Sequence, residues 1–509
     1  MLEYTPDRHL TGGLRLAAHK IDSTARPIKR GLVPTRLILP LAQHRGAPAE
    51  PVVSVGERVL RGQRVAAAAS LETADVHATT SGVVRAIEMR AVPALAGVAA
   101  APCIVIDADG DHESIDFAAD SWPEERAAQL ARVRAGGIVG LGGAAYPTAA
   151  KIGAAPACRI IIINGAECEP YISCDDVLMR EAPEQIVAGA RLLGEIVGAE
   201  QCIIAIERDK PLAIDAIGQA AGDGGSAPRL RLAELPTIYP AGGERQLIEV
   251  LIGEEVPAGR YPSDIALLCQ NVGTAFAVHR LAAHGEPLLS RIVTVAGRGV
   301  ATAQNVEVPI GTPVAELIAF CGGYREGARR LLHGGSMMGY ALPNDDMPVA
   351  KGTSCVVAAT TEEIRVDYSE WPCIRCGECQ SACPARLQPQ ELLIAGRSAD
   401  HAALDVLGLY ECIECGCCDV VCPSHIPLTE IFRRVKVVHR AHERQLQFST
   451  DSAQRFLRRE ERHRAEAQHA RELQEQLIRD VQFGEIGKGA LQAAVERARR
   501  KRESGTEPD

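Results

Sequence analysis

The sequence predicts a multidomain protein of mixed α/β and α+β class, and three observations support this. Its 509 residues are 46% hydrophobic, enough to bury several separate cores. Short strand patterns and glycine turns dominate the segment after Pro51, whereas strands alternate with helices from Ile160 onward. Two cysteine-rich runs follow from Cys373. These changes of texture predict about three to four domains.

The composition excludes several classes of function. The net charge is −10 and no basic stripe crosses the central domains, so we expect no nucleic-acid partner. The longest apolar run, Ala91 to Ile106, has sixteen residues and two prolines, short of the roughly 20 that span a bilayer, so no transmembrane segment is expected. The seventeen cysteines are clustered and no apolar signal region opens the chain, which predicts a reducing compartment, the cytoplasm.

The chain is predicted to begin with an extended arm, residues 1–30, and a β-rich domain, residues 31–115. In the β-rich part, β-branched residues alternate with glycine turns. This pattern resembles the biotinyl/lipoyl type of barrel-sandwich domain. A carrier of that type needs an attachment lysine, and none occurs between Lys29 and Lys151. We therefore expect a docking or scaffolding role for this lipoyl-like domain.

Residues 116–288 predict a doubly wound, Rossmann-like domain. The apolar run Ile160 to Ile163 is typical of a buried parallel strand. It is followed by a helix over 175–199, a strand over 202–206, a helix over 212–221 and a strand over 230–235. Such alternation implies right-handed βαβ units in one sheet.

A glycine-rich loop precedes this sheet. Gly140, Gly142 and Gly143 leave the backbone bare, so an anionic group can approach it closely. Lys151 follows, one of only eight lysines among 55 lysine and arginine residues, and its ammonium suits a phosphate. The loop also fits the loose dinucleotide fingerprint GxGxxG/A, but no clear strand precedes it and Pro147 interrupts the helix start.

Residues 289–360 show short strands, a Pro-Ile-Gly-Thr-Pro turn and one amphipathic helix. This texture resembles the soluble-ligand-binding β-grasp domain. No convergent polar cluster in it argues for a ligand, so we expect a spacer and docking surface.

Residues 361–445 contain two runs of the form CxxCxxCxxxCP. In such a run three thiolates wrap one corner of an iron–sulfur cube, and the fourth, turned by the proline, points toward a second cube. This pattern predicts two [4Fe-4S] clusters. Cluster one would take Cys373, Cys376, Cys379 and Cys422, and cluster two would take Cys412, Cys415, Cys418 and Cys383.

Two structural zinc sites are the alternative, since zinc also favours four cysteines. Zinc ribbons, however, use CxxC pairs separated by a longer loop, and a repeated CxxC step crowds sulfurs more tightly than one ion needs. Cys417 breaks the register of both quartets and is predicted not to be a ligand. Residues 389–408 have helical texture, which favours an α-helical ferredoxin domain.

Residues 446–509 are highly charged with sparse apolar positions. They predict a solvated helix stabilised by opposite charges at i,i+4. A partner-binding helix and a mobile tail are both open readings of this segment.

Four segments carry a specific resemblance: GLGGAAYPTAAK, NGAECEPY, YPAGGERQLI and QNVGTA. They resemble the flavin-binding segments of the FMN- and NADH-binding subunit of respiratory complex I. The β-rich domain precedes these segments and the double cysteine run follows them. Over roughly residues 10–440, this order of segments is similar to that in the C subunit of the Rnf (Rsx) electron-transport complex.

The resemblance implies a noncovalent FMN site that takes NAD(H) as substrate. The implied flavin contacts are Gly140, Gly142, Gly143, Tyr146, Lys151, Asn164, Tyr239, Gly242, Gly243, Glu244, Asn271 and Thr274. Glu167 and Glu169 are the residues implied on the catalytic, nicotinamide side. Gln270 departs from the complex I pattern, which has asparagine there.

The function implied is that of a peripheral enzyme subunit on the cytoplasmic side of the inner membrane. It would exchange electrons between NAD(H) and the clusters through FMN, because a flavin accepts a hydride and passes electrons on singly. Its partners would be other subunits of an Rnf-type translocase, an iron–sulfur subunit among them. A soluble corrinoid-reductase-like flavoprotein and a flavin-free electron relay are the alternatives.

Overall fold

The computed structural model divides the chain into two compact units, Met1–Arg433 and Arg434–Asp509. It describes residues 2–4, 10–44, 46–70, 72–94, 97–117, 121–155, 158–222, 228–364, 369–482 and 487–503. Parts of the predicted arm (1 and 5–9) and of the predicted tail (483–486 and 504–509) lie outside the described residues. The two units are described separately below.

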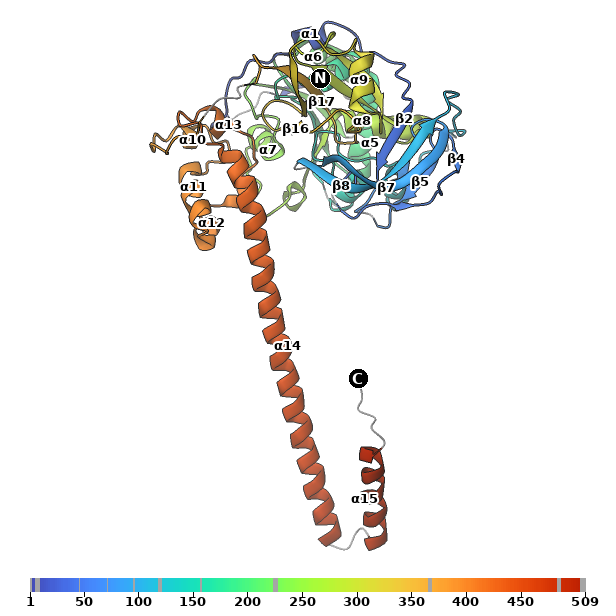
Figure 1. Ribbon diagram of the computed structural model, residues 1–509, viewed down its shortest axis with the longest axis vertical. Coiled ribbons are helices and arrows are strands. Elements are labelled where there is room, and N and C mark those ends of the chain that lie inside the picture. Colours follow the sequence, from blue (N-terminus) through green and yellow to red (C-terminus); the bar gives the residue numbers. More distant parts are fainter. Residues whose placement is uncertain are drawn as a thin grey trace. The chain divides into compact units, whose positions relative to one another are not determined.

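The β-rich domain consists of two antiparallel sheets (Figure 1). One has the order β2-β8-β7-β4 and the other β3-β5-β6. The strands are β2 (Arg36–Pro40), β3 (Glu50–Pro51), β4 (Arg58–Val59), β5 (Arg64–Ala67), β6 (Val76–His77), β7 (Gly82–Ala94) and β8 (Gly97–Ala108). Gly82 is required where β7 meets β8, because a Cβ there would lie 2.2 Å from the Asp107 carbonyl oxygen.

A five-stranded parallel sheet of order β1-β11-β10-β9-β12 forms the second domain. Its strands are β1 (Leu2–Tyr4), β9 (Ile160–Gly165), β10 (Gln201–Glu207), β11 (Arg229–Leu235) and β12 (Leu267–Asn271). Ile161 and Ile163 pack with α5 and α8 on one face, whereas Ile160 and Ile162 pack with α7 on the other. The helices therefore cover both faces, as predicted for this part of the chain.

The helices of this domain are α2 (Arg126–Ala135), α3 (Thr148–Gly153), α4 (Cys174–Glu181), α5 (Pro183–Val197), α6 (Pro211–Ala221), α7 (Glu244–Ile252) and α8 (Val272–His284), with a 3₁₀ turn at Pro262–Ile265. The sequence predicted one helix over 175–199, but the structure has two. Pro183 lacks the N–H that a continuous helix would use, and it instead opens α5. Helix α5 then packs closely on α8, since a Cβ on Gly189 would lie 1.9 Å from the Ala275 carbonyl oxygen.

The segment predicted as an extended arm is tied to the rest of the first unit. β1 pairs in parallel with β11 and so extends the sheet by one strand. Farther on, residues 10–30 include the short helix α1 (Ile21–Thr24). Leu14 forms an antiparallel bridge with Tyr239, and the Gly13 N–H bonds to the Ala382 carbonyl at 3.0 Å. We call residues 10–30 the strap, because backbone bonds tie it to distant segments.

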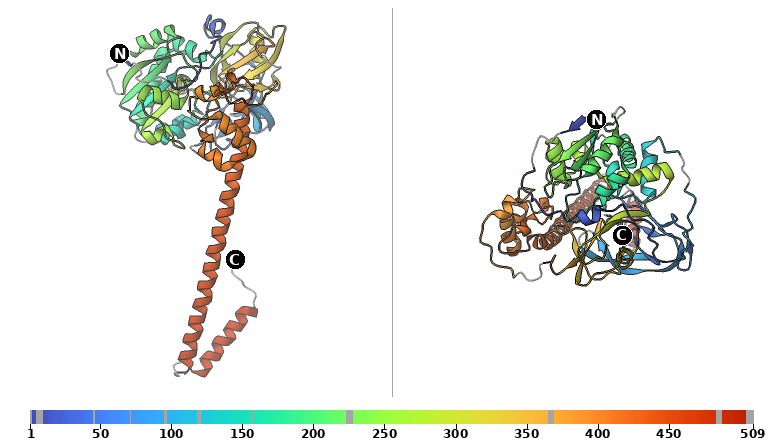
Figure 2. Two further views of the ribbon diagram at one scale, coloured as in Figure 1. Left: turned by 90° about the vertical axis from the view of Figure 1, so that its left-hand side faces the viewer. Right: turned by 90° about the horizontal axis from the view of Figure 1, so that it is seen from above.

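The third domain is a mixed sheet of order β14-β13-β17-β15-β16 with one helix. Its elements are β13 (Ser290–Ala296), β14 (Gln304–Pro309), α9 (Val314–Phe320), β15 (Ala328–His333), β16 (Tyr340–Leu342) and β17 (Cys355–Thr360). It lies beside the β-rich domain (Figure 2), and the Ile38 N–H bonds across to the Gly311 carbonyl at 2.8 Å.

The cysteine-rich region is built of short helices: α10 (Glu378–Ser381), α11 (Pro389–Ser398), α12 (His401–Val406), a 3₁₀ turn at Leu409–Glu411 and α13 (Cys417–Val420). It lies against α7 of the parallel-sheet domain (Figures 1 and 2). Arg245 pairs with Glu411 at 2.8 Å, and Arg386 pairs with Glu249. The helical texture predicted over 389–408 corresponds to α11 and α12.

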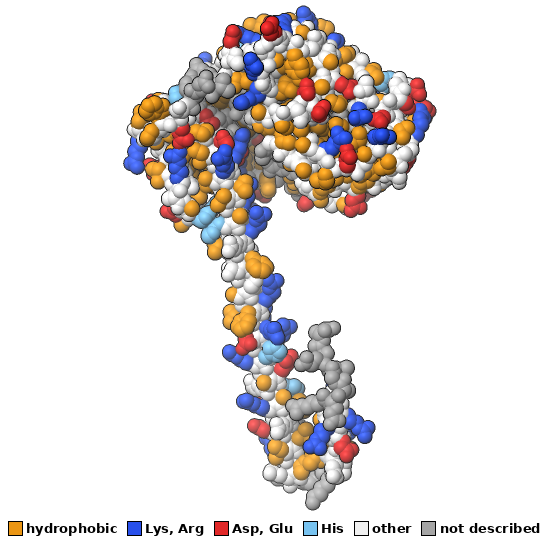
Figure 3. Space-filling model, viewed as in Figure 1, with side chains coloured by type: hydrophobic (Ala, Val, Ile, Leu, Met, Phe, Trp, Pro, Cys, Tyr) orange, Lys and Arg blue, Asp and Glu red, His pale blue; other side chains and the backbone are white. Residues whose placement is uncertain are grey.

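The second unit contains most of α14 (Leu428–Gln482), which begins in the first unit, and α15 (Lys488–Glu503). Charges of both signs interleave along α14 from residue 446, and its side chains there are mostly exposed (Figure 3). This agrees with the predicted solvated helix. Within the part of the chain that the structure describes, no helix is both apolar and long enough to cross a bilayer.

Candidate functional site

The glycine-rich loop is held at the carboxyl end of the parallel sheet. Its ends are joined by the Gly140 N–H, which bonds to the Tyr146 carbonyl at 2.8 Å. Its middle is fixed to the start of α8, because the Leu141 N–H donates to Thr274 Oγ1 at 3.0 Å. Gly142 and Gly143 are exposed at the tip, and Gly143 has a φ of +95°, which favours glycine. The loop thus presents bare backbone where open α/β sheets bind ligands.

Lys151 reaches the same edge from α3. Its Nζ donates to Glu244 Oε1 and to the Cys269 carbonyl, both at 2.6 Å. Burial by itself would lower the Lys151 pKa, but the Glu244 carboxylate, together with Cys269 and Tyr146, raises the pKa above its ordinary value. The ammonium is therefore charged, and it is held between the start of α7 and the middle of β12.

Two asparagines join the strand ends. Asn164 and Asn271 are register partners at the ends of β9 and β12. Asn271 accepts from the Gly273 N–H at 2.8 Å, which caps α8, and donates to Asp175 Oδ2 at 2.6 Å. Asn164 donates to the Gly242 carbonyl at 2.8 Å. These side chains hold the loops around the site in place.

Several groups at this edge fit a polar ligand such as FMN. Thr148 Oγ1 and Gln270 Nε2 are buried, and neither has a hydrogen-bond partner among the described residues. Buried polar atoms are nearly always paired in proteins, so this lack indicates a partner beyond the described residues, such as a bound ligand. Gly242 is also restricted, because a Cβ there would lie 3.1 Å from Cys168 Sγ. With the exposed glycine tip and the Lys151 cation, these residues suit a flavin phosphate.

Glu167 is engaged by backbone groups. Its carboxylate accepts from the N–H groups of Asp175, at 2.6 Å, and Asp176, at 3.2 Å, at the start of α4. The residue has a φ of +50°, and its carbonyl accepts from Lys20 Nζ of the strap. Burial raises the pKa of Glu167, and the neighbouring Asp175 raises it further. Direct chemistry by this carboxylate would require it to release the two N–H groups.

Glu169 connects two domains. Its Oε1 accepts from the N–H groups of Met337, at 2.7 Å, and Met338, at 3.0 Å, in the β15–β16 connection. Burial raises the pKa of Glu169, although these two donors oppose the shift. The residue therefore fastens the parallel-sheet domain to the third domain.

Glu169→Ala should destabilise the first unit by about 1–3 kcal/mol, because the N–H groups of half-buried Met337 and exposed Met338 lose their shared acceptor. Denaturant unfolding followed by circular dichroism measures the change. Glu362→Ala is the matched control: Glu362 forms an exposed ion pair with Arg298, so its removal should cost about 0–1 kcal/mol. Equal midpoints for the two variants would contradict the fastening role.

The Tyr239 side chain is buried against the cysteine-rich region. It is 3% exposed, and its hydroxyl donates to the Cys415 carbonyl at 2.7 Å. Tyr239, Ala382, Cys415 and Cys417 form one buried cluster. The implied flavin loop after β11 is thus in direct contact with a predicted ligand of cluster two.

In the structure, three cysteines of the first run lie together with the last cysteine of the second run. A hollow between the runs is lined by Cys373, Cys376, Cys379 and Cys422, the predicted ligands of cluster one. Cys373 and Cys376 are exposed, whereas Cys415 and Cys418 are buried. Helices α10 and α13 contain the third cysteines of the two runs, Cys379 and Cys418, and lie beside each other.

Sequence reasoning missed three contributors to this region. Lys20 comes from the strap, more than a hundred residues before Glu167. Arg291 of β13 is buried and donates to the Leu141 carbonyl at 2.9 Å. Asp175 lines a cavity with Leu141 and Arg291 beside the start of α8. The scarcity of lysine was a signal for Lys20, but no local pattern connects Lys20 or Arg291 to the loops they touch.

Four domain families match the chain in order. They are the RnfC barrel sandwich hybrid domain at residues 8–111, the Nuo51 FMN-binding domain at 133–280, the SLBB domain at 292–341 and the 4Fe-4S dicluster domain at 371–426. The matches confirm the multidomain class and the predicted cofactor classes, FMN and [4Fe-4S] clusters.

Relatives match over most of the chain. The C subunit of the ion-translocating oxidoreductase complex from Pseudomonas aeruginosa is 47% identical over 89% of this chain and 59% of its own length. The protein of the same name from Rhodobacter capsulatus is 41% identical over 84% of this chain and 82% of its own length. The chain thus spans about three fifths of the first relative.

Among solved structures, the chain is similar to an NAD+-reducing [NiFe]-hydrogenase in the H2-reduced state, with 21% sequence identity and a TM-score of 0.43. That likeness covers 65% of this chain and 64% of the other. Together with the four domain matches, the identity to the Rhodobacter protein shows the family. The chain belongs to the family of C subunits of ion-translocating oxidoreductase complexes.

Proposed function

We propose that this chain is the peripheral electron-transfer subunit of a membrane-bound, ion-translocating oxidoreductase complex. It exchanges electrons between NAD(H) and two [4Fe-4S] clusters through a noncovalent FMN. It acts on the cytoplasmic side of the membrane and passes electrons to ferredoxin- or flavodoxin-linked partner subunits, one of which carries iron–sulfur clusters. The family and the two cofactor-type domains support this proposal.

One contact carries the proposal: the Tyr239 hydroxyl on the Cys415 carbonyl, 2.7 Å apart. It joins the loop implied to hold the flavin to a cysteine implied to hold cluster two. The buried group around it also contains Ala382 and Cys417, so the junction excludes water. A flavin domain and a cluster domain that served separate reactions would not require such a shared core.

The chain's residues have distinct tasks in this proposal. FMN supplies the conversion of a two-electron hydride into single electrons. The glycine tip and Lys151 bind its phosphate, and Thr148 and Gln270 offer buried polar atoms that have no partner within the described part of the chain. Glu167 and Glu169 shape the nicotinamide side through the backbone groups that they hold.

The two cysteine quartets hold one cluster each, and the exposure of Cys373 and Cys376 suits transfer from cluster one to a partner. The same proposal assigns a fold to each domain. In chain order they are a lipoyl-like β domain without carrier function, a Rossmann-like flavin domain, a β-grasp domain and an α-helical ferredoxin domain.

Anaerobic purification of the full chain tests the proposal. We expect about one FMN and about eight irons per chain, and bleaching of the cluster absorbance when NADH is added. A preparation fully loaded with clusters but without flavin, and inert to NADH, would leave only the relay alternative. Failure to copurify with integral-membrane subunits from the native host would favour the soluble reductase instead.

A further inference from the structure

The strap runs across the carboxyl edge of the parallel sheet, although it lies outside the 133–280 match to the FMN-binding domain. The Ala18 carbonyl accepts from the Tyr171 N–H at 2.8 Å. The His19 ring stacks on the Tyr171 ring, with centroids 4.9 Å apart. The strap therefore contacts the loop after β9 directly, just before Lys20.

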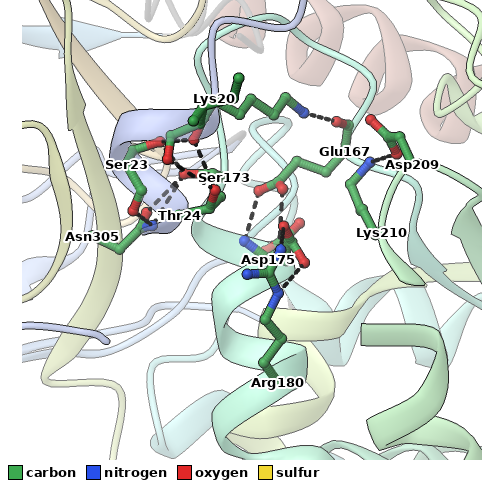
Figure 4. A network of polar contacts seen from close by, with 12 residues as sticks. Lys20, Ser23, Thr24, Glu167, Ser173, Asp175, Arg180, Asp209, Lys210 and Asn305 are labelled. Carbon is green, nitrogen blue, oxygen red and sulfur yellow. Dashed lines mark hydrogen bonds and ion pairs between the residues drawn. The ribbon is translucent and has the colours of Figure 1, made fainter. Parts of the chain in front are cut away.

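Lys20 inserts its ammonium into this loop (Figure 4). The residue is 8% exposed, and its Nζ donates to the Glu167 carbonyl. The carboxylate of Glu167 is taken up by the start of α4, while Lys210 is paired with Glu207 at 3.0 Å and Asp209 at 2.7 Å. Lys20 thus places a second positive charge, beside that of Lys210, near the carboxylates of this region. It does so from a distant part of the sequence.

Both sides of this contact have strained backbones. His19 has a φ of +53°, Glu167 of +50° and Tyr171 of +69°. Non-glycine residues in this region cost on the order of 1–3 kcal/mol each and persist only when the surroundings hold them. Three such residues at one contact indicate a loop shape that is maintained for a purpose.

The strap is anchored without Lys20. The hydroxyls of Ser23 and Ser173 lie 2.7 Å apart, and Asn305 Nδ2 donates to the Ser23 carbonyl at 3.0 Å (Figure 4). Farther on, the Ile28 N–H donates to Glu181 Oε1 at 2.5 Å. Since these bonds attach the strap, the buried ammonium is not needed to keep it in place.

We propose that Lys20 is a positioning residue for the nicotinamide side of the flavin site. By holding the Glu167 carbonyl, it keeps the loop of residues 165–171 in the shape that accepts NADH. The strap is then part of the substrate site, although it precedes the flavin domain in sequence. This inference rests on the proposed function above.

The test compares Lys20→Met, Lys20→Arg and Lys29→Met in the full chain loaded with FMN and clusters. Lys29 is a matched control, because it is also a strap lysine whose Nζ donates to a backbone carbonyl, that of Phe320 at 2.6 Å. NADH-driven reduction of ferricyanide gives KM and kcat. Hydrogen–deuterium exchange of residues 165–171 reports the loop itself, with or without NADH chemistry.

Lys20→Met should raise the KM for NADH about tenfold, with kcat within about threefold of the original chain, and should speed exchange in residues 165–171 about tenfold. FMN and iron content should stay unchanged, Lys20→Arg should recover most of the KM, and Lys29→Met should match the original chain. Unchanged KM and exchange in Lys20→Met overturn the inference, as does an equal effect of Lys29→Met. An original chain that is inert to NADH overturns the proposed function instead, and the exchange data then still decide the role of Lys20.

Discussion

Cys373→Ser and Cys422→Ser should remove the same iron–sulfur cluster, although the two cysteines belong to different motifs. Both line the hollow that also contains Cys376 and Cys379. A serine hydroxyl is a poor substitute for a thiolate in an iron–sulfur cube, so either change should leave about four irons per chain in place of about eight. Cys383→Ser should instead remove the other cluster.

Iron and sulfide analysis gives the number of clusters, and electron paramagnetic resonance of the reduced protein identifies the one that remains. The spectra of Cys373→Ser and Cys422→Ser should coincide and differ from that of Cys383→Ser. Cys417→Ser serves as the control, because Cys417 is predicted not to be a ligand. This variant should retain about eight irons per chain. Coinciding spectra for Cys373→Ser and Cys383→Ser would mean that each motif binds its own cluster.

Lys151→Met should weaken FMN binding about 10- to 100-fold and leave the iron content unchanged. A hydrogen bond from a charged group contributes about 1.5–3 kcal/mol, which corresponds to this range of affinity. Methionine keeps most of the side-chain length but removes the cation that Glu244 and the Cys269 carbonyl hold at the sheet edge. The loss should therefore be confined to the flavin.

Flavin and iron are quantified in the same anaerobic preparation, and FMN titration of the flavin-free protein gives the affinity. Lys29→Met removes an ammonium of the strap that lies 4.0 Å from the Phe320 ring of the third domain, and this variant should retain full flavin. Equal loss of flavin and iron in Lys151→Met would show that this lysine supports the whole unit and not the flavin site.

Much of the architecture could be read from local patterns. The strands β9 and β10 coincide with apolar runs, because a strand buried on both faces must be largely apolar. The multidomain class and the cofactor classes were predicted from the sequence, and the comparisons confirm them. The individual site residues stay predictions until the substitutions above are made.

Local patterns could not show which groups single side chains contact. Glu167 is predicted on the catalytic side, and only the structure shows that its carboxylate also holds the start of α4. Tyr239 is predicted at the flavin, and only the structure shows that its hydroxyl reaches Cys415, 176 residues away. The arm is predicted to be extended, and only the structure shows that β1 joins the sheet and that Lys20 contacts the loop after β9.

The sequence by itself determined which chemistry this protein can hold, because cysteine spacing and bare glycine backbone are local properties of the chain. Only the tertiary structure decided which of these groups meet. Contacts such as Lys20 with Glu167 depend on the path of the whole chain, since the strap must cross the sheet edge before its ammonium can reach a carbonyl 147 residues later. The spacing of residues within a short segment therefore does not predict such long-range contacts.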